Sequence, residues 1–247
     1  MRIIISPAKK MKVREDCLNH HDLPVFLEDT ARIMNWVKSL SLAEAQTLWD
    51  CNEKLARENF DRFSKMELCG RLTPAILSYE GIQYQYMAPA IFEDKMLAYV
   101  QEHLRILSGF YGVLKPLDGV TPYRLEMQAK TKIGGINGLY DFWGNRLYQE
   151  VLDASHVFIN LASKEYSKCI ERYLMPQDRF VTCIFGELSN DKVVQKGTYA
   201  KMARGEMVRF MAEKNITEPE NIKQFDRLGY RFVETLSTDT EYVFIKQ

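Results

Sequence analysis

The sequence predicts a mixed α/β fold, because three short apolar runs each end on a serine and helical segments lie between them. The runs cover residues 3–5 before Ser6, 106–107 before Ser108, and 157–162 before Ser163. Each run is rich in Ile, Val or Leu and is bounded by turn residues, as expected of strands buried on both faces. With 247 residues and 46% hydrophobic content, the chain can form one compact domain with a central mixed sheet and surrounding helices.

The segment 23–70 is expected to form a small helical lobe. Pro24 favours a helix start, and this helix is predicted to run to about residue 40, with Ile33 and Val37 on its buried face. Ser41 and Glu44 then have the spacing of a capping box, in which each side chain accepts a hydrogen bond from a free backbone amide. The box predicts a second helix that runs to about residue 63.

The rest of the chain alternates between strands and helices. Residues 75–79 are predicted as a strand, and residues 92–104 as a helix that leads into the strand before Ser108. Residues 180–185 are apolar and strand-like. The last stretches, 230–233 and 242–245, alternate between apolar and polar residues and predict a terminal strand pair. Between them and the preceding strand, Thr217 and Glu220 resemble another capping box.

An extended segment at 122–127 places Arg124 and Glu126 on one face, because side chains alternate along extended backbone. A glycine-rich loop at 134–138 follows, and it fits either a plain turn or a lid over the serines. Residues 140–152 after the loop are predicted to be helical.

Residues 201–212 predict a helix with one apolar and one basic face at 100° per residue. The apolar face carries Ala203, Met207, Phe210 and Met211. The basic face carries Lys201, Arg204 and Arg209, interspersed with Gly205 and Ala212. A solvated charged face is one interpretation. The small residues between the charges favour the other, a surface on which a backbone or a phosphate lies close to the helix.

The three serines predict a ligand site where strands end. Strand ends of an open α/β sheet meet at one edge, and Gly109 and Gly112 after Ser108 allow backbone amides to turn toward an anion such as phosphate. The alternative is that each serine ends a strand and caps the next helix. The Gly-x-x-Gly spacing after Ser108 fits two structures, the hairpin of a helix-hairpin-helix element or a loop at a strand end.

Charge and cysteine content limit the function classes. Lys+Arg and Asp+Glu both total 33, so a nucleic-acid partner requires a local basic patch. No apolar stretch approaches membrane-spanning length, which favours a cytoplasmic protein. Five cysteines without a C-x-x-C pair favour reduced thiols. His20 and His21 beside Cys17 are read as an exposed loop, so no metal and no cofactor are predicted.

Five segments resemble the successive signature blocks of the YaaA family of bacterial peroxide-stress proteins. They are ISPAKKM at 5–11, HLRILSGFYGVLKPLDGVTPYRLEM at 103–127, LYDFWG at 139–144, INLASKEY at 159–166 and YAKMARGEMVRFM at 199–211. The resemblance implies a cytosolic protein that limits hydrogen peroxide damage, is associated with lower free iron, and binds DNA through a positively charged cleft. It also implies an α/β fold with a helix-hairpin-helix element, and no established reaction.

The resemblance assigns cleft positions residue by residue. The matching positions are Ser6, Lys9, Ser108, Gly109, Tyr111, Gly112, Arg124, Glu126, Asn160, Ser163, Lys164, Tyr166, Lys201, Arg204 and Arg209. Met202 stands where a second basic residue is usual in the family, which weakens the basic helix by one charge.

Two functions compete on these residues. The first is a stress protein that binds DNA with weak sequence specificity and protects the duplex by occupying it. The second is an uncharacterised enzyme that acts on a nucleotide or on a base stacked on Tyr111 or Tyr166, with Glu126, Asn160 and Lys9 as catalytic candidates. The second function predicts one concave pocket that contains Ser6, Lys9, Arg124, Glu126, Asn160 and Ser163. Iron sequestration by the protein itself is disfavoured, because no His, Cys and carboxylate cluster has ligand spacing.

Overall fold

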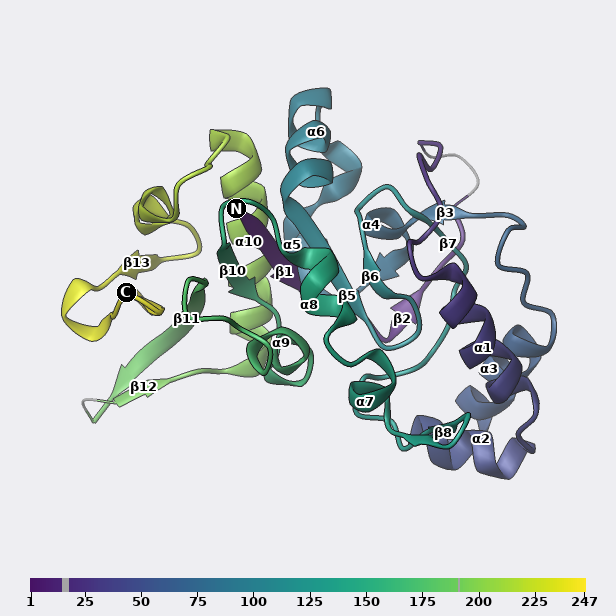
Figure 1. Ribbon diagram of the computed structural model, residues 1–247. Coiled ribbons are helices and arrows are strands. Elements are labelled where there is room, and N and C mark those ends of the chain that lie inside the picture. The colour runs from purple at the N-terminus through teal and green to yellow at the C-terminus, as the bar shows by residue number, and fades with distance from the viewer. Residues whose placement is uncertain (15–17, 191) are drawn as a thin grey trace.

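A mixed sheet runs through the molecule and brings distant parts of the chain together (Figure 1). The computed structural model describes residues 1–14, 18–190 and 192–247, and over these residues the sheet has eight strands in the order β13-β14-β11-β10-β1-β5-β6, with β12 paired to β11. The strands are β1 (Arg2–Ile5), β5 (Leu104–Ser108), β6 (Gly112–Leu114), β10 (Val157–Leu161), β11 (Arg179–Ser189), β12 (Lys192–Val194), β13 (Tyr230–Phe232) and β14 (Glu241–Lys246). The predicted mixed α/β fold is therefore confirmed.

Strand β1 lies at the centre of the sheet. It pairs in parallel with β5 on one side and with β10 on the other, so that Ile5 is opposite both Ile106 and Leu161. Ile3, Ile4 and Ile5 are completely buried, because both faces of a parallel sheet are covered. The predicted terminal pair also forms: β13 and β14 are antiparallel, and β14 joins the sheet beside β11.

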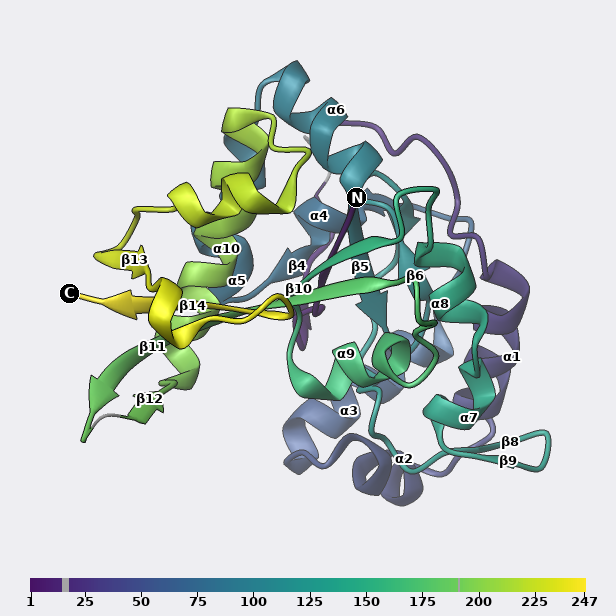
Figure 2. The ribbon, with the colours of Figure 1, turned by 60° about the vertical axis from the view of Figure 1, so that its left-hand side comes forward.

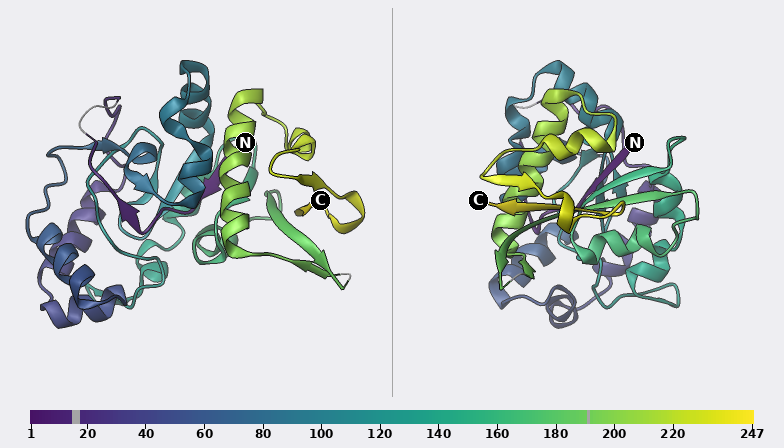
Figure 3. Two further views of the ribbon diagram at one scale, coloured as in Figure 1. Left: turned by 180° about the vertical axis from the view of Figure 1, so that it is seen from behind. Right: turned by 90° about the vertical axis from the view of Figure 1, so that its left-hand side faces the viewer.

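Helices cover the sheet and form a group at one end (Figures 1 and 2). They are α1 (Leu27–Lys38), α2 (Leu42–Trp49), α3 (Glu53–Ser64), α4 (Ala75–Ser78), α5 (Ile82–Met87), α6 (Asp94–His103), α7 (Leu139–Trp143), α8 (Arg146–Val151), α9 (Lys164–Glu171) and α10 (Gly197–Lys214). Three 3₁₀ turns are η1 (Pro89–Ile91), η2 (Pro219–Gln224) and η3 (Glu234–Leu236). Helix α10 packs on α5, α6 and β11, whereas α8 and α9 pack on each other across the sheet from α10 (Figure 3).

Short strand pairs connect the remaining segments. They are β2 (Lys10–Met11) with β4 (Tyr79–Glu80), β3 (Thr73–Pro74) with β7 (Gly119–Val120), and β8 (Lys132–Ile133) with β9 (Ile136–Asn137). No helix within the described residues is long and apolar enough to cross a membrane.

Three predicted elements are wrong in type or length. Residues 75–78 of the strand predicted at 75–79 form the helical turn α4, and only Tyr79 lies in a strand, at the start of β4. A short buried apolar run fits either structure. The predicted helix after Ser41 keeps its capping box, but it is divided at Asp50, whose φ of 42° is left-handed. The helix predicted at 140–152 is divided at Gly144, whose φ is 57°.

The capping box predicted at 217–220 does not form. The first residue before η2 is Glu218, and it makes no side-chain hydrogen bond to the turn. The glycine-rich loop at 134–138 is the β8–β9 hairpin, which lies beside α1, so the lid interpretation is not supported.

Candidate functional site

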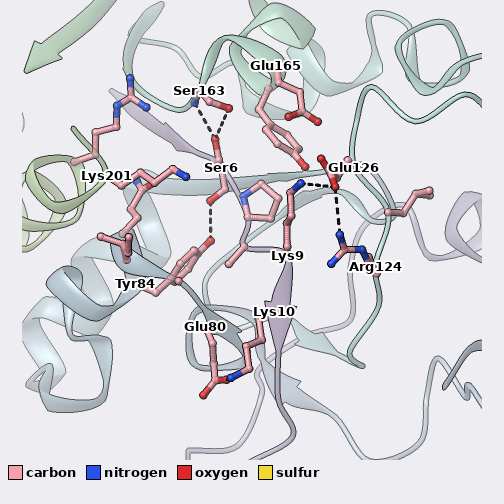
Figure 4. A pocket seen from close by; sticks show the side chains of 18 of the residues that line it. Ser6, Lys9, Lys10, Glu80, Tyr84, Arg124, Glu126, Ser163, Glu165 and Lys201 are labelled. Atoms are coloured by element: carbon pink, nitrogen blue, oxygen red, sulfur yellow. Dashed lines mark hydrogen bonds and ion pairs between the residues drawn. The ribbon is translucent and has the colours of Figure 1, made fainter. Parts of the chain in front are cut away.

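A pocket of about 530 Å³ opens where β1 and β10 end (Figure 4). The segment after β1, the start of α5, the extended residues 123–126, the start of α9 and the first turns of α10 surround it. Its charged and hydroxyl-bearing residues are Ser6, Lys9, Lys10, Glu80, Tyr84, Tyr123, Arg124, Glu126, Ser163, Glu165, Tyr166, Lys201 and Arg204.

Two of the three predicted serines meet at the centre of this pocket. The parallel pairing of β1 with β10 brings Ser6 and Ser163 to the same level, since each directly follows the paired residues Ile5 and Leu161. The Ser163 amide donates to Ser6 Oγ at 2.8 Å, and Ser6 Oγ donates to Ser163 Oγ at 3.2 Å. Tyr84 donates its hydroxyl proton to the Ser6 carbonyl at 3.0 Å and holds this end of the chain in place.

Glu126 holds two cations on one side of the pocket. Lys9 Nζ lies 2.7 Å from Glu126 Oε1, and Arg124 Nη2 lies 3.9 Å from the same oxygen. The predicted common face of Arg124 and Glu126 is confirmed by this contact. Lys9 is 63% exposed and Arg124 only 14%, so Arg124 is held in the protein while Lys9 reaches into solvent.

Arg204 from α10 is a largely buried cation that has no counterion among the residues that the structure describes. Its Nε atom is buried and has no hydrogen-bond partner, and within the described residues no carboxylate lies within ion-pair distance of its guanidinium. Burial lowers the pKa of Arg204, which indicates that its charge is poorly solvated. Arg124 Nε is likewise buried and unpaired. Unpaired buried donors on cations are costly, and an anionic ligand would satisfy them.

Glu165 is a second pocket carboxyl that sequence reasoning missed. It receives the Gln128 amide at 3.3 Å, and burial raises its pKa with a further contribution from nearby Glu126. Its position in the first turn of the helix after Ser163 was the available signal.

Glu80 is a third pocket carboxyl, and sequence reasoning missed it because no pattern marks it. Its carboxylate pairs with Lys12 and, at 3.3 Å, with Lys10. The hydrogen bond from Lys12 lowers the pKa of Glu80.

Comparison with known proteins decides the family. The family described as "Peroxide stress protein YaaA" matches residues 1–236. The chain belongs to the YaaA family. It is 60% identical over 244 residues to a UPF0246 protein of Agathobacter rectalis, covering 99% of this chain and 98% of that one. It is 56% identical over 246 residues to a UPF0246 protein of Lachnoclostridium phytofermentans, covering 100% and 96% of the two chains.

In this YaaA family member the turn after Ser108 is not an anion site. Ser108 is completely buried, and its Oγ receives the amides of Phe110 at 3.2 Å and Tyr111 at 2.9 Å. Its hydroxyl also bonds to Tyr123 at 2.7 Å. The prediction of an anion cradle is therefore wrong, because the protein itself uses these amides.

The same turn joins two antiparallel strands, β5 and β6, so the helix-hairpin-helix interpretation of Gly109 and Gly112 is wrong at this segment. Gly112 has a positive φ of 75°, whereas Gly109 is required for packing, because a Cβ there would lie 2.8 Å from the Leu125 carbonyl oxygen. Tyr111 is fully buried and cannot stack on a base.

Two further candidates of the YaaA pattern, Asn160 and Lys164, lie outside the pocket. Asn160 is 4% exposed and bonds to Thr182 Oγ1 at 3.2 Å and to the Ala162 amide at 2.9 Å, so it is a satisfied structural residue. Lys164 is exposed and pairs with Glu171. The prediction that Asn160 shares the pocket is therefore wrong. The pocket is lined together by the other five predicted residues, Ser6, Lys9, Arg124, Glu126 and Ser163. Tyr166 also lines it, with a mostly buried ring.

The predicted basic face of α10 divides into two parts. Lys201 and Arg204 line the pocket, but Arg209 lies outside it and pairs with Glu213 at 2.8 Å. Gly205 does not face a ligand: a Cβ there would overlap the Gln83 carbonyl of α5. Ala212 is buried, so the small residues serve helix packing and the contact-surface interpretation fails for them.

The described part of the chain contains no cluster of metal-ligating side chains. No group of three His, Cys, Asp or Glu residues is placed to hold an ion there. Cys51, Cys69, Cys169 and Cys183 are free thiols, as predicted for the described cysteines, and burial raises the pKa of both Cys169 and Cys183 to about 12. Cys17 lies outside the described residues.

Proposed function

We propose that this chain is a cytoplasmic peroxide-stress protein that binds DNA at the cationic opening of the pocket and so limits iron and peroxide damage. The observation that carries the proposal is Arg204, a largely buried cation that lacks a counterion among the described residues. A phosphate would supply the missing charge and receive the unused donors.

The charge distribution supports this partner. The whole chain has zero net charge, yet the pocket is lined by the five cations Lys9, Lys10, Arg124, Lys201 and Arg204 against the three carboxylates Glu80, Glu126 and Glu165. Lys12 adds a cation beside Lys10. A local excess of this kind attracts the phosphate backbone without reading bases, so we expect weak sequence specificity.

The test is the salt dependence of duplex DNA binding by the full chain. Affinity should fall steeply with salt, and Lys201→Ala should lower the slope of log affinity against log salt by about 1, because one phosphate contact is lost. Lys164→Ala is the matched control, since Lys164 is exposed, pairs with Glu171 and lies outside the pocket. A flat salt dependence, or equal losses in both variants, contradicts the proposal.

A second candidate function, an enzyme acting on a nucleotide or a base, is favoured by the two carboxyls in one pocket. Glu126 is held by Lys9 and Arg124, whereas Glu165 receives a backbone amide, and different surroundings of two carboxyls are typical of acid–base pairs. Chromatography of nucleotides and oligonucleotides after incubation with the protein tests it. Product formation that Glu126→Gln abolishes supports an enzyme; unchanged substrates exclude it for those compounds. If Glu126→Gln lowers the survival of cells in peroxide but leaves the affinity for DNA unchanged, that result also supports an enzyme.

A further inference from the structure

The pocket has two chemically different ends. In Figure 4, Lys201 lies on one side, Glu126, Arg124 and Glu165 lie on the other, and Ser6 stands between them. From these two ends we infer that the pocket binds one nucleotide, with its phosphate at Lys201 and Arg204 and its base edge at Glu165. The inference rests on the proposed nucleic-acid function and adds to it the unit that enters the pocket.

The phosphate end consists of two cations one helical turn apart. Lys201 and Arg204 are three residues apart on α10 and therefore lie on the same side of the helix. No ion pair engages either of them in the part of the chain that the structure describes, and Arg204 Nε is buried without a partner. The hydroxyls of Ser6 and Ser163 lie between this end and the other, where they can bond to a sugar or a phosphate oxygen.

The base end pairs an acceptor with a donor. Glu165 accepts the Gln128 amide on Oε1, and within the described residues no cation forms an ion pair with it. Arg124 offers its unpaired buried Nε on the same side of the pocket. Every base edge carries hydrogen-bonding groups that such a combination can match, and the rings of Tyr123 and Tyr166 supply apolar lining for the base.

The size of the pocket limits what enters it. A volume of about 530 Å³ lies within the range of roughly 300–1,000 Å³ of small-molecule sites. It excludes a duplex, so a nucleotide of DNA reaches it only from a single strand or after rotation out of the base stack. A free mononucleotide has the same chemistry, and the two sources require separate measurements.

The first experiment is calorimetric titration of the full chain with ribose 5-phosphate, AMP and GMP. At least one mononucleotide should bind about tenfold more tightly than ribose 5-phosphate, because only it reaches Glu165. Glu165→Gln, which keeps the shape of the side chain, should remove most of that difference and leave the affinity for ribose 5-phosphate unchanged. Arg204→Met should weaken all three ligands about tenfold, and Lys164→Ala should change none.

The second experiment places 2-aminopurine in a single strand, in a mismatched pair and in a matched duplex. Its fluorescence should rise on binding when the labelled base leaves the stack, with the largest rise at the mismatch, and Glu165→Gln should reduce the rise. Mononucleotide binding without any fluorescence change identifies a free nucleotide as the source. Equal affinities of ribose 5-phosphate and both mononucleotides, or equal loss for all ligands in Glu165→Gln, overturn the inference. Salt-dependent DNA binding in that case would leave the proposed function intact.

Discussion

Replacing Arg204 by Met separates stability from ligand binding. Met keeps most of the apolar stem but removes a guanidinium whose Nε is buried and unpaired. An unsatisfied buried polar group costs about 1–3 kcal/mol, and we expect the lower end because Arg204 is still partly exposed. For a chain of this size, about 1 kcal/mol of added stability raises the Tm by roughly 2–4 °C. The variant should therefore melt higher than the wild type while its affinity for DNA falls about tenfold.

The matched control is Arg209→Met on the same helix. Arg209 pairs with Glu213 at 2.8 Å and lies outside the pocket, so its replacement should leave DNA affinity unchanged and the Tm equal or slightly lower. Differential scanning calorimetry and fluorescence anisotropy measure the two quantities. A lower Tm in Arg204→Met, or unchanged DNA affinity, would refute the assignment of Arg204 as an unpaired anion-binding cation.

Three further changes test the fold and its response to pH. Gly205→Ala should destabilise the chain by about 1–3 kcal/mol in urea denaturation, because its Cβ overlaps α5, while Gly197→Ala on the same helix, with open space around it, should be neutral or slightly stabilising. Ser108→Ala should lower the free energy of unfolding by about 1–3 kcal/mol, since it removes a buried acceptor of two amides, and should leave DNA affinity intact. A loss of DNA affinity in this variant would show that the turn takes part in binding. Burial raises the pKa of Asp118 to about 7, so its carboxyl ionises at a higher pH in the folded state than in the unfolded state. The free energy of unfolding should therefore decrease as the pH rises from about 4 to about 7. Asp118→Asn should flatten that dependence, and an unchanged pH profile of the Tm would contradict it.

The fold was largely predictable from the sequence because apolar runs and caps are local signals. Buried runs marked β1, β5 and β10, and the capping box at Ser41 marked the start of α2. Two predicted helices were too long because left-handed residues, Asp50 and Gly144, divide them, and one error arose from an ambiguous short run. Residues 75–78 are all buried, so their periodicity could not distinguish a strand from a helical turn, and only contacts with residues 116 and 118 select the turn.

The candidate site was predictable only in part, because a site depends on which strand ends meet. The serines after β1 and β10 meet since these strands are parallel neighbours. Ser108 also ends a neighbour of β1, but the chain turns back at once into β6. Its hydroxyl is buried within that turn, where it contacts the amides of Phe110 and Tyr111 and the Tyr123 hydroxyl. Glu165 is marked in the sequence only by its place in the first turn of the helix after Ser163, and Glu80 is marked by no pattern. The tertiary arrangement brings both carboxyls to the pocket.

The central position of β1 has a consequence for synthesis of the chain. Residues 2–5 leave the ribosome about 100 residues before strand β5 and more than 100 residues before strand β10, the two strands that pair with them in the sheet. At roughly 5–20 residues per second, this apolar segment waits for roughly 5–20 s or more without a strand partner. During that interval Ile3, Ile4 and Ile5 are an exposed, unpaired strand of the type that chaperones shield and that aggregates when it is left free. Lys201 and Arg204 emerge later still, so a nascent chain acquires the two cations proposed to bind phosphate only after β5 and β10, the strand neighbours of β1, have been synthesised.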